Sequence, residues 1–371
     1  MFCQPVNGAA TIHDVAVTTM SANGAADDPG RPTMREVAAL AGVSLKTVSR
    51  VINAEPNVSP DLVEKVVRAA KQLGYVPHLG ARSLRRSDRR TATVGLLLAD
   101  MSNAFSAVLM RTVDDVARPR GVFVMAASHD EDEDRERALI TEFVARRVDG
   151  LMLTPACSDL SYLVQQQRAG LPVVCLDRPA LGVGADTVLV DNFGAVRQGI
   201  EHLLGYGHRR IAYLGHHGRI YTSTQRHNGY LAALHAAGIA ADDSLCRLGA
   251  GDDAFGYCTA LELLSRPDPP TAIFAARNAI TMGVVRALAE RGLSTTIALL
   301  GFDDFPLSDL LTPPVSVIAQ DVPALGRAAA ELLFARIGAD TGPEQTITLQ
   351  PTLIPRGSGE INVSAACSAG R

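Results

Sequence analysis

Short apolar runs alternate with longer amphipathic segments through most of the chain after residue 92. The runs are apolar nearly throughout, which is typical of parallel strands buried on both faces. The segments between them repeat apolar residues at helical spacing. We predict strands at residues 93–99, 122–128, 150–155, 172–177, 187–191, 210–215, 272–276 and 297–303. We predict helices at residues 104–117, 135–147, 192–206, 223–237, 279–291 and 322–337.

This alternation predicts open parallel sheets with helices on both faces, an α/β architecture. About 270 residues of the pattern exceed one comfortable hydrophobic core, so we expect two lobes. Polar residues recur where the predicted strands end, the edge at which such sheets bind ligands. They are Asp100, Asn103, His129, Asp130, Asp177, Arg178, Asp191, Asn192, Arg277, Asn278, Asp303 and Asp304. Any single one is more simply explained as a helix cap, but their recurrence favours a cleft for a polyhydroxyl or charged small molecule.

A different pattern fills residues 33–74, where three short amphipathic helices are predicted. Thr33 and Glu36 have the spacing of a capping box at the first helix. Gly42 ends that helix in a tight turn, and Ser44 can cap the second helix, which runs to about Ile52. The third helix begins with a cap, a proline and an acid in its first turn, the tripeptide Ser59-Pro60-Asp61. We expect Pro77 to end this helix.

Two helices joined by a short glycine-containing turn predict a helix-turn-helix unit. Val48, Val51 and Ile52 would face the neighbouring helices. The opposite face would offer its side chains to a DNA major groove: Leu45, Lys46, Ser49 and Arg50. Arginine and lysine suit guanine acceptors, while Ser44, Thr47 and the helix N-terminus suit phosphate oxygens. A plain three-helix bundle with no DNA role remains the alternative.

Charge is distributed unevenly along the chain. Residues 31–90 carry twelve Lys or Arg against five Asp or Glu, although the whole chain has a net charge of −4. All three lysines lie in this segment, at positions 46, 65 and 71. A small basic module on a large acidic one is typical of a DNA-contacting head on a separate body. A solvated charged face that contacts nothing is the competing interpretation.

The segment "GYVPHLGARSLRR" follows the third predicted helix. "ARSLRR" is too short to be a stable helix in water and would form when packed against a twin subunit and DNA. Leu84 stands among Arg82, Arg85 and Arg86, as expected of an apolar wedge at a minor-groove step with cations on the phosphates. A basic linker is the alternative.

Other classes of protein find little support in the sequence. No Walker loop, GxSxG elbow or GxGxxG after a strand is present, so a sugar kinase or another enzyme is not favoured. The six cysteines are scattered without a CxxC pair, which predicts free thiols and no zinc site. His208, His216 and His217 have no nearby ligands to complete a metal set. We expect no cofactor.

Location is predicted from the absence of sorting signals. No apolar run reaches the length of a membrane span, and residues 1–30 lack a secretory signal and are expected to form a disordered tail. We therefore expect a cytoplasmic protein with no membrane partner. An exported sugar-binding protein, the other interpretation of the large module, would need such a signal.

The stretch "REVAALAGVSLKTVSRVIN…VSPDLVEKVVRAAKQLGYVPHLGARSL" closely resembles the DNA-binding headpiece of the lactose/galactose repressor (LacI/GalR) family over about 55 residues. The resemblance implies base-reading side chains at Leu45, Lys46 and Arg50 and a minor-groove lever at Leu84. The full set of DNA-contacting positions that it implies is Thr33, Ser44, Leu45, Lys46, Thr47, Ser49, Arg50, Asn53, His78, Ala81, Arg82 and Leu84. His78-Leu79-Gly80-Ala81 departs from the family's usual Asn-Ala-Leu-Ala, and Gly80 should weaken a hinge helix by about 0.5–1 kcal/mol.

The large module also resembles the core of this family, which is similar to periplasmic sugar-binding proteins, in "GLLLADMSNAF", "VVCLDRP", "TAIFAARN" and "GFDD". The resemblance implies a tail (1–30), a helix-turn-helix domain (31–76), a hinge (77–90), a two-lobed core (91–358) and a flexible tail (359–371). The first lobe would comprise residues 91–188 and 321–342, and the second residues 190–318 and 345–358, with three chain crossings. Implied effector contacts are Asn103, Phe105, Asp177, Arg178, Arg226, Arg277, Asp303 and Gln320.

Departures from the family pattern bear on the effector. Ser106 stands where a second stacking aromatic is usual, Arg277 replaces a usual asparagine, and Asp253 stands where an aromatic is often found. We predict that a sugar acid or sugar phosphate is preferred over a neutral sugar, with Arg178, Arg226 and Arg277 as anion partners. Pairing of Arg277 with Asp253 is the alternative. The resemblance thus implies a homodimeric regulator, in the first place a repressor, that binds double-stranded, near-palindromic operator DNA under control of a small-molecule effector.

Overall fold

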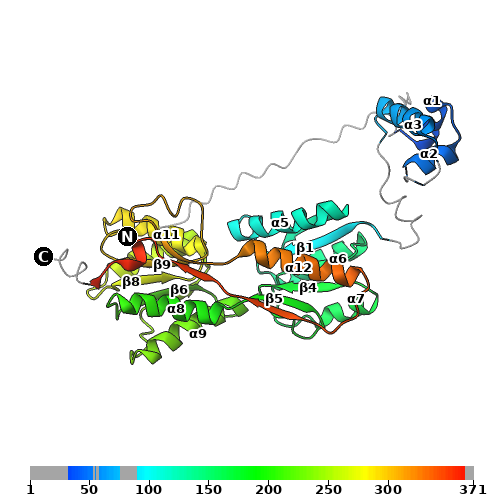
Figure 1. The fold of residues 1–371 in the computed structure, drawn as a ribbon. Helices are drawn as coiled ribbons and strands as arrows, with labels where there is room; N and C mark the ends of the chain where they lie inside the picture. Colours follow the sequence, from blue (N-terminus) through cyan, green and yellow to red (C-terminus); the bar gives the residue numbers. More distant parts are fainter. Residues whose placement is uncertain (1–31, 53–54, 56–57, 76–89, 364–371) are drawn as a thin grey trace, which may run out of the picture. The chain divides into compact units, whose positions relative to one another are not determined.

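The computed structural model describes residues 32–52, 55, 58–75 and 90–363. The chain divides into two compact units on either side of Arg85, a small helical unit and a large α/β unit (Figure 1). Across the described residues, we find no helix with the length and apolar character needed to cross a membrane.

The small unit consists of the three predicted helices, α1 (Met34–Ala41), α2 (Leu45–Ile52) and α3 (Pro60–Leu73). Val37, Val48 and Val66 are fully buried at their centre. Val51 and Ile52 pack against the same cluster, as the spacing of apolar residues predicted. Three residues separate α1 from α2, which confirms the helix-turn-helix arrangement.

The helix ends follow from local chemistry, with two corrections. The capping box is present: Thr33 N donates to Glu36 Oε2 at 2.6 Å and Glu36 N to Thr33 Oγ1 at 3.4 Å. Gly42 adopts a left-handed φ of 66°, which a glycine tolerates without strain. Ser59 occupies the N-cap position of α3, but its side chain makes no capping hydrogen bond. Gly74, with φ 64°, ends α3, so the helix terminates before Pro77, which lies outside the described residues.

The first lobe of the large unit is built on a six-stranded, fully parallel sheet of order β11-β5-β4-β3-β1-β2 (Figure 1). Its strands are β1 (Thr93–Leu98), β2 (Phe123–Ser128), β3 (Leu151–Leu153), β4 (Val173–Leu176), β5 (Asp186–Val190) and β11 (Thr346–Leu349). Helices α5 (Ala104–Ala117) and α12 (Val322–Ile337) pack on one face. Helices α6 (Glu133–Ala145) and α7 (Val164–Arg168) pack on the other.

The second lobe repeats the plan with the order β12-β10-β9-β8-β6-β7, in which only β12 is antiparallel to its neighbour. Its strands are β6 (Ile211–His216), β7 (Cys246–Gly249), β8 (Ala272–Ala275), β9 (Ala298–Phe302), β10 (Ser316–Ala319) and β12 (Thr352–Ile354). Helices α8 (Asn192–Gly205) and α9 (Tyr221–Ala236) cover one face, and α10 (Asp253–Leu264) and α11 (Asn278–Glu290) the other. Three short 3₁₀ helices complete the described elements: Arg118–Arg120, Ser161–Leu163 and Ser358–Glu360.

The chain crosses between the lobes after β5, after β10 and after β11. Our assignment of residues 345–358 to the second lobe was wrong in part, because β11 pairs with β5, Thr346 opposite Thr187. Only two residues separate β11 from β12, so the last crossing falls between two short neighbouring strands. Strands β7, β10, β11 and β12 and helices α7 and α10 were not predicted.

Candidate functional site

The outward face of α2 presents the predicted base-reading side chains unequally. Leu45 is 45% exposed, and Lys46 is exposed, whereas Ser49 and Arg50 are half-buried. Arg50 Nε lies 3.5 Å from Glu55 Oε2 in an ion pair at the surface. A large apolar side chain exposed beside a lysine at the start of this helix is consistent with a contact face.

The hydroxyl groups assigned to phosphate contacts already have local partners. Ser44 Oγ accepts a hydrogen bond from Thr47 N at 3.1 Å and lies 2.9 Å from Thr47 Oγ1. Ser44 is therefore the N-cap of α2, as predicted. Thr33 Oγ1 donates to Glu36 Oε2 at 2.9 Å. Each hydroxyl oxygen can still accept a further hydrogen bond, so helix capping is compatible with a contact near the DNA phosphates.

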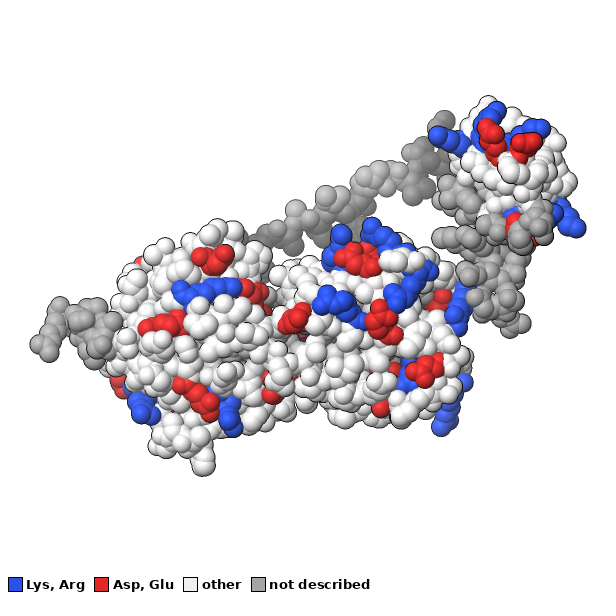
Figure 2. Space-filling model, viewed as in Figure 1, with Lys and Arg blue, Asp and Glu red and all other residues white. Residues whose placement is uncertain are grey.

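Much of the predicted DNA-binding set lies outside the described residues: Asn53, His78, Ala81, Arg82 and Leu84. Residues 32–75 contain six Lys or Arg and four Asp or Glu, so most of the basic excess belongs to residues 76–90. Side chains of both signs are interspersed on the face of the helical unit visible in Figure 2. The minor-groove wedge at Leu84 stays a prediction.

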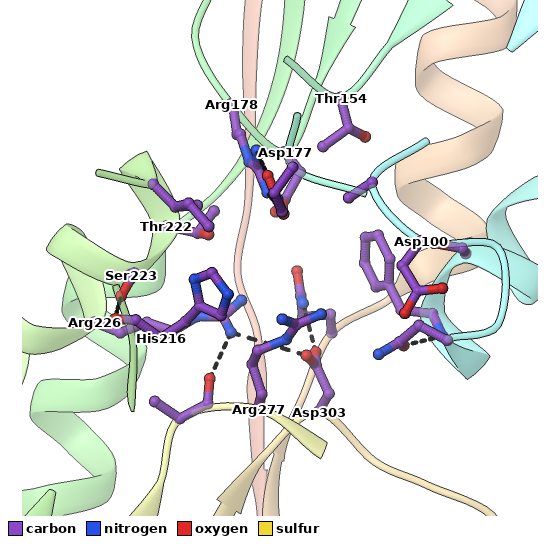
Figure 3. A pocket seen from close by; sticks show the side chains of 18 residues that line it. Asp100, Thr154, Asp177, Arg178, His216, Thr222, Ser223, Arg226, Arg277 and Asp303 are labelled. Carbon is purple, nitrogen blue, oxygen red and sulfur yellow. Dashed lines mark hydrogen bonds and ion pairs between the residues drawn. The ribbon is translucent and has the colours of Figure 1, made fainter. Parts of the chain in front are cut away.

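All eight predicted effector positions line a single pocket between the two lobes (Figure 3). The pocket has a volume of about 680 Å³ including its open mouth, within the range usual for small-molecule sites. Asp177 and Arg178 extend from the end of β4, while Arg277 and Asp303 extend from the ends of β8 and β9 on the opposite side. The strand-end pattern therefore located the pocket, although binding at these residues stays a prediction.

Arg178 is held by a carboxylate that the sequence analysis did not select. Its two terminal nitrogens donate to Glu131 Oε2 and Oε1 at 2.7 and 2.6 Å, and Nη1 also donates to Pro155 O at 2.5 Å. Burial opposes the ionisation of Glu131, but the hydrogen bonds and charge of Arg178 outweigh it and lower the pKa of Glu131. The pair is ionised and bidentate.

Arg226 is fixed from several sides. Its Nε donates to Asn192 Oδ1 at 2.7 Å, and Nη1 donates to Ala276 O at 2.7 Å. The guanidinium carbon lies 3.7 Å from the centre of the Phe302 ring, a cation–π contact. Asp303 Oδ2 lies 3.9 Å from Nη1, so Arg226 is largely neutralised inside the protein.

Two pocket aspartates occupy left-handed backbone positions, Asp177 at φ 63° and Asp303 at φ 68°. Asp303 Oδ1 accepts a hydrogen bond from Gln320 Nε2 at 2.5 Å. Asp177 is buried, and its Oδ1 has no hydrogen-bond partner. Burial raises the pKa of Asp177, although Arg226 and Arg178 oppose the increase. Asp177 Oδ1 is therefore available to accept a hydrogen bond from a ligand hydroxyl group.

Arg277 differs from the other two arginines. Within the described residues, no hydrogen bond or ion pair engages its guanidinium group, and it does not pair with Asp253 at the start of α10. Figure 3 shows its side chain extending toward the middle of the pocket. The three predicted anion partners therefore differ in the structure: Arg178 and Arg226 have acidic protein partners, and Arg277 has none among the described residues, while anion binding at all three stays a prediction.

A reciprocal amide pair joins the two lobes at the pocket. Asn103 Nδ2 donates to Asn278 Oδ1 at 3.0 Å, and Asn278 Nδ2 donates to Asn103 Oδ1 at 3.1 Å. Asn103 also caps α5 by accepting from Phe105 N at 2.9 Å. Asn103 therefore both caps α5 and lines the pocket.

Polar atoms without partners concentrate in this pocket. Eight buried side-chain nitrogen or oxygen atoms of the described residues lack a hydrogen bond, and five of them belong to pocket residues. These five are Thr154 Oγ1, Asp177 Oδ1, Arg178 Nε, His216 Nδ1 and Gln320 Oε1. Buried polar groups are nearly always satisfied in folded proteins. The set, which mixes donors and acceptors, fits a ligand that carries several hydroxyl groups.

Several pocket residues were not selected from the sequence: Asp100 as a contact, Glu131, Thr154, His216, Thr222 and Ser223. Glu131 lies in "DEDEDRER", which reads as a solvated helix start. His216 was weighed only as a metal ligand, and burial together with Arg277 lowers its pKa. The described residues contain no group of three or more His, Cys, Asp or Glu arranged to hold a metal ion.

Comparisons with known proteins agree with both units. The model for bacterial regulatory proteins of the lacI family matches residues 33–78, and the model for the periplasmic binding protein-like domain matches residues 200–359. The ribose operon repressor of Escherichia coli (strain K12) is 33% identical over 331 residues, which cover 88% of this chain and 99% of that protein. The HTH-type transcriptional regulator CelR of Thermobifida fusca is 35% identical over 339 residues, which cover 89% and 98%.

A solved structure of a CelR–cellobiose complex has a TM-score of 0.65 and 33% identity, covering 88% of this chain and all of that one. The predicted fold class, a helix-turn-helix headpiece with a two-lobed periplasmic-binding-protein-like core, is thereby confirmed. The curated relatives named above are a repressor and a transcriptional regulator, not enzymes. This chain belongs to the lacI family of bacterial regulatory proteins.

Proposed function

We propose that this protein is a cytoplasmic, homodimeric repressor that binds a near-palindromic operator and responds to a small polyhydroxyl effector. The observation that carries the proposal is the gathering of five unpaired buried polar atoms in the interlobe pocket of a chain that also contains a lacI-type headpiece. Such a pocket supplies a receptor, and the headpiece supplies a DNA contact.

The effector class is inferred from the pocket chemistry and from relatives. Asp177 and Gln320 offer acceptors, Arg277 and Arg178 offer donors, and Phe105 offers an apolar surface. This combination suits a sugar or a sugar acid. One relative is named a ribose operon repressor, and one structural neighbour is a complex with cellobiose, which supports a sugar-type effector for this chain.

The test begins with selection of a preferred duplex from a random pool, followed by fluorescence anisotropy at physiological salt. We expect specific binding at two chains per duplex and a change in operator affinity when a sugar or sugar acid from a screening panel is added. Arg50→Ala should cost about 1–3 kcal/mol at one base position. Binding no tighter than to a scrambled duplex, with and without the panel, would contradict the proposal.

A second pair of variants separates specific from electrostatic binding. Leu84→Ala should weaken operator binding and spare non-specific binding, because a wedge acts only where the duplex is opened. Arg68→Ala is the control: Arg68 is exposed on α3 and pairs with Glu64 four residues away. Equal losses of specific and non-specific binding in Leu84→Ala would count against the wedge.

A further inference from the structure

We propose that Glu131 sets the charge selectivity of the pocket. By holding Arg178 in a bidentate ion pair, Glu131 restricts the ligand to a neutral polyhydroxyl compound or to one with a single negative charge. A phosphate dianion is excluded from the Arg178 side of the pocket. The inference rests on the effector pocket of the proposed function and narrows its ligand class.

The pair matches the charge of Arg178 and occupies both of its terminal nitrogens, and Nε is the donor that stays without a partner. Both carboxylate oxygens of Glu131 accept from the two terminal nitrogens, and Pro155 O accepts a further hydrogen bond. The side chain of Arg178 is only 8% exposed, and that of Glu131 is 22% exposed. A ligand phosphate that displaced this carboxylate would have to desolvate it and leave it without a partner in a low-dielectric site, which is strongly unfavourable.

Glu131 is held rigidly where it stands. The loop after β2 places two consecutive residues in the left-handed region, Asp130 at φ 53° and Glu131 at φ 61°. His129 is fully buried; its Nδ1 accepts from Glu131 N at 3.1 Å, and its Nε2 lies 2.7 Å from Thr154 O. The neutral Nε2–H form of His129 satisfies both bonds. The imidazole therefore ties the Glu131 backbone to the loop that carries Thr154 into the pocket.

The other charged side chains of the pocket limit the ligand to one negative charge. Arg226 is matched by Asp303, which leaves Arg277 as the cation without a partner among the described pocket residues. Asp100 and Asp177 line the same pocket. A carboxylate could bind Arg277 alone, but a phosphate ester of charge near −2 would meet one available cation and several acidic groups. Neutral hydroxyl groups of a ligand can donate hydrogen bonds to both Asp177 Oδ1 and Gln320 Oε1.

The first experiment requires no knowledge of the natural ligand. Glu131→Ala removes the carboxylate and leaves a gap beside Arg178, and the probes are formate and inorganic phosphate exchanged for chloride at constant ionic strength. We expect either anion to raise the melting temperature of Glu131→Ala by about 3 °C at ten times its dissociation constant. The wild type and the double variant Glu131→Ala/Arg178→Met should show at most the smaller gain that Arg277 supports, because only the single variant Glu131→Ala frees Arg178.

Controls keep this experiment decisive. Glu131→Gln retains one acceptor for Arg178 and carries the test if the alanine variant does not fold. Glu133→Gln, an exposed change in the first turn of α6, should behave as the wild type. An equal anion-dependent shift in the wild type, or the absence of a shift in both Glu131 variants, would overturn the assignment of Glu131.

The second experiment tests selectivity by calorimetry with matched sets: ribose, ribonate and ribose 5-phosphate, and the corresponding glucose compounds. For any sugar that binds, we expect the phosphate ester to bind the wild type at least about tenfold more weakly than the neutral or carboxylate form. Glu131→Gln should narrow that difference. Equal or tighter binding of a phosphate ester by the wild type refutes the selectivity. Failure of every sugar to bind would count against the proposed function, and the anion experiment would still decide the role of Glu131.

Discussion

At the scale of single residues, the pocket is built from side chains whose positions depend on unusual backbone conformations. Asp177 and Asp303 follow β4 and β9 with positive φ, and the backbone N–H groups donate to Val188 O and Ile318 O. These hydrogen bonds to neighbouring strands hold each aspartate at the C-terminal edge of its sheet. Such strain, of order 1–3 kcal/mol per residue, persists only where the surroundings fix it.

Asp177→Asn should stabilise the unliganded protein at neutral pH. Burial raises the pKa of Asp177, so the folded protein holds this proton more tightly than the unfolded chain does. The free energy of unfolding therefore falls as pH rises from about 4 through the raised pKa. Asparagine removes that loss and tolerates a left-handed φ. Urea unfolding of variant and wild type should give a difference near zero at pH 4 that becomes a gain at pH 7.5.

Asp304→Asn is the matched control of opposite sign. Hydrogen bonds from Arg356 lower the pKa of Asp304 to about 2. That stabilisation is present above the unfolded pKa and is lost as pH falls toward 2, so this variant should be less stable by about 1 kcal/mol at pH 7.5, after allowance for solvent screening. Destabilisation by Asp177→Asn at pH 7.5 would contradict the account of Asp177.

Sequence reasoning found Asp177, Arg178, Arg277 and Asp303 because parallel strands bring their carboxyl ends to one edge. Arg226 lies within α9 and was selected only through the family resemblance. Sequence reasoning did not find Glu131, because an acid within a run of acids resembles a solvated helix start. It also could not find that Arg178 and Arg226 are neutralised. Their acidic partners, Glu131 and Asp303, are distant from them in the sequence. Pairings at that separation depend on tertiary structure.

At the scale of elements, α10 and α11 pack with their backbones in close approach. A Cβ on Gly283 would lie 2.1 Å from Asp253 O, and a Cβ on Gly256 would lie 2.4 Å from Ile280 O. The two glycines therefore allow one helix to lie against the other. Helix α10 was missed from the sequence because apolar residues occur all around "DAFGYCTALELL", whereas strands such as β1 were found because continuous burial leaves an unbroken apolar run.

Gly283→Ala should destabilise the second lobe by at least about 2 kcal/mol, because the added methyl group must push α10 away or shift α11. Gly205→Ala is the matched control, since a Cβ at this helical glycine would meet no atom within 4 Å. It should be neutral or stabilising by about 0.5 kcal/mol. Chemical denaturation of the two variants beside the wild type gives both values, and equal effects would show that helix propensity, and not the close approach, governs Gly283.

At the scale of the whole molecule, the two lobes are joined both covalently and through the pocket. Three chain crossings connect the sheets, and the Asn103–Asn278 amide pair bridges them. A ligand that contacts Asp177 in one lobe and Arg277 in the other would add interactions across the same gap. The relative arrangement of the lobes can therefore respond to ligand, and with it the state of a DNA-binding segment attached to the first lobe.

Linkage gives this coupling a measurable form. If the effector changes operator affinity by some factor, the operator must change effector affinity by the same factor, expected to be about 5–150-fold. Calorimetry of effector binding with and without operator, and anisotropy of operator binding with and without effector, give the two factors independently. Scrambled duplex should leave effector affinity unchanged.

Asn278→Ala removes the amide bridge and should move both factors toward one by the same amount, because it weakens the one interlobe arrangement that the pair favours. Coupling that is unaltered in this variant would show that the amide pair does not contribute to the conformational change, and effector affinity that ignores operator altogether would separate the pocket from DNA binding.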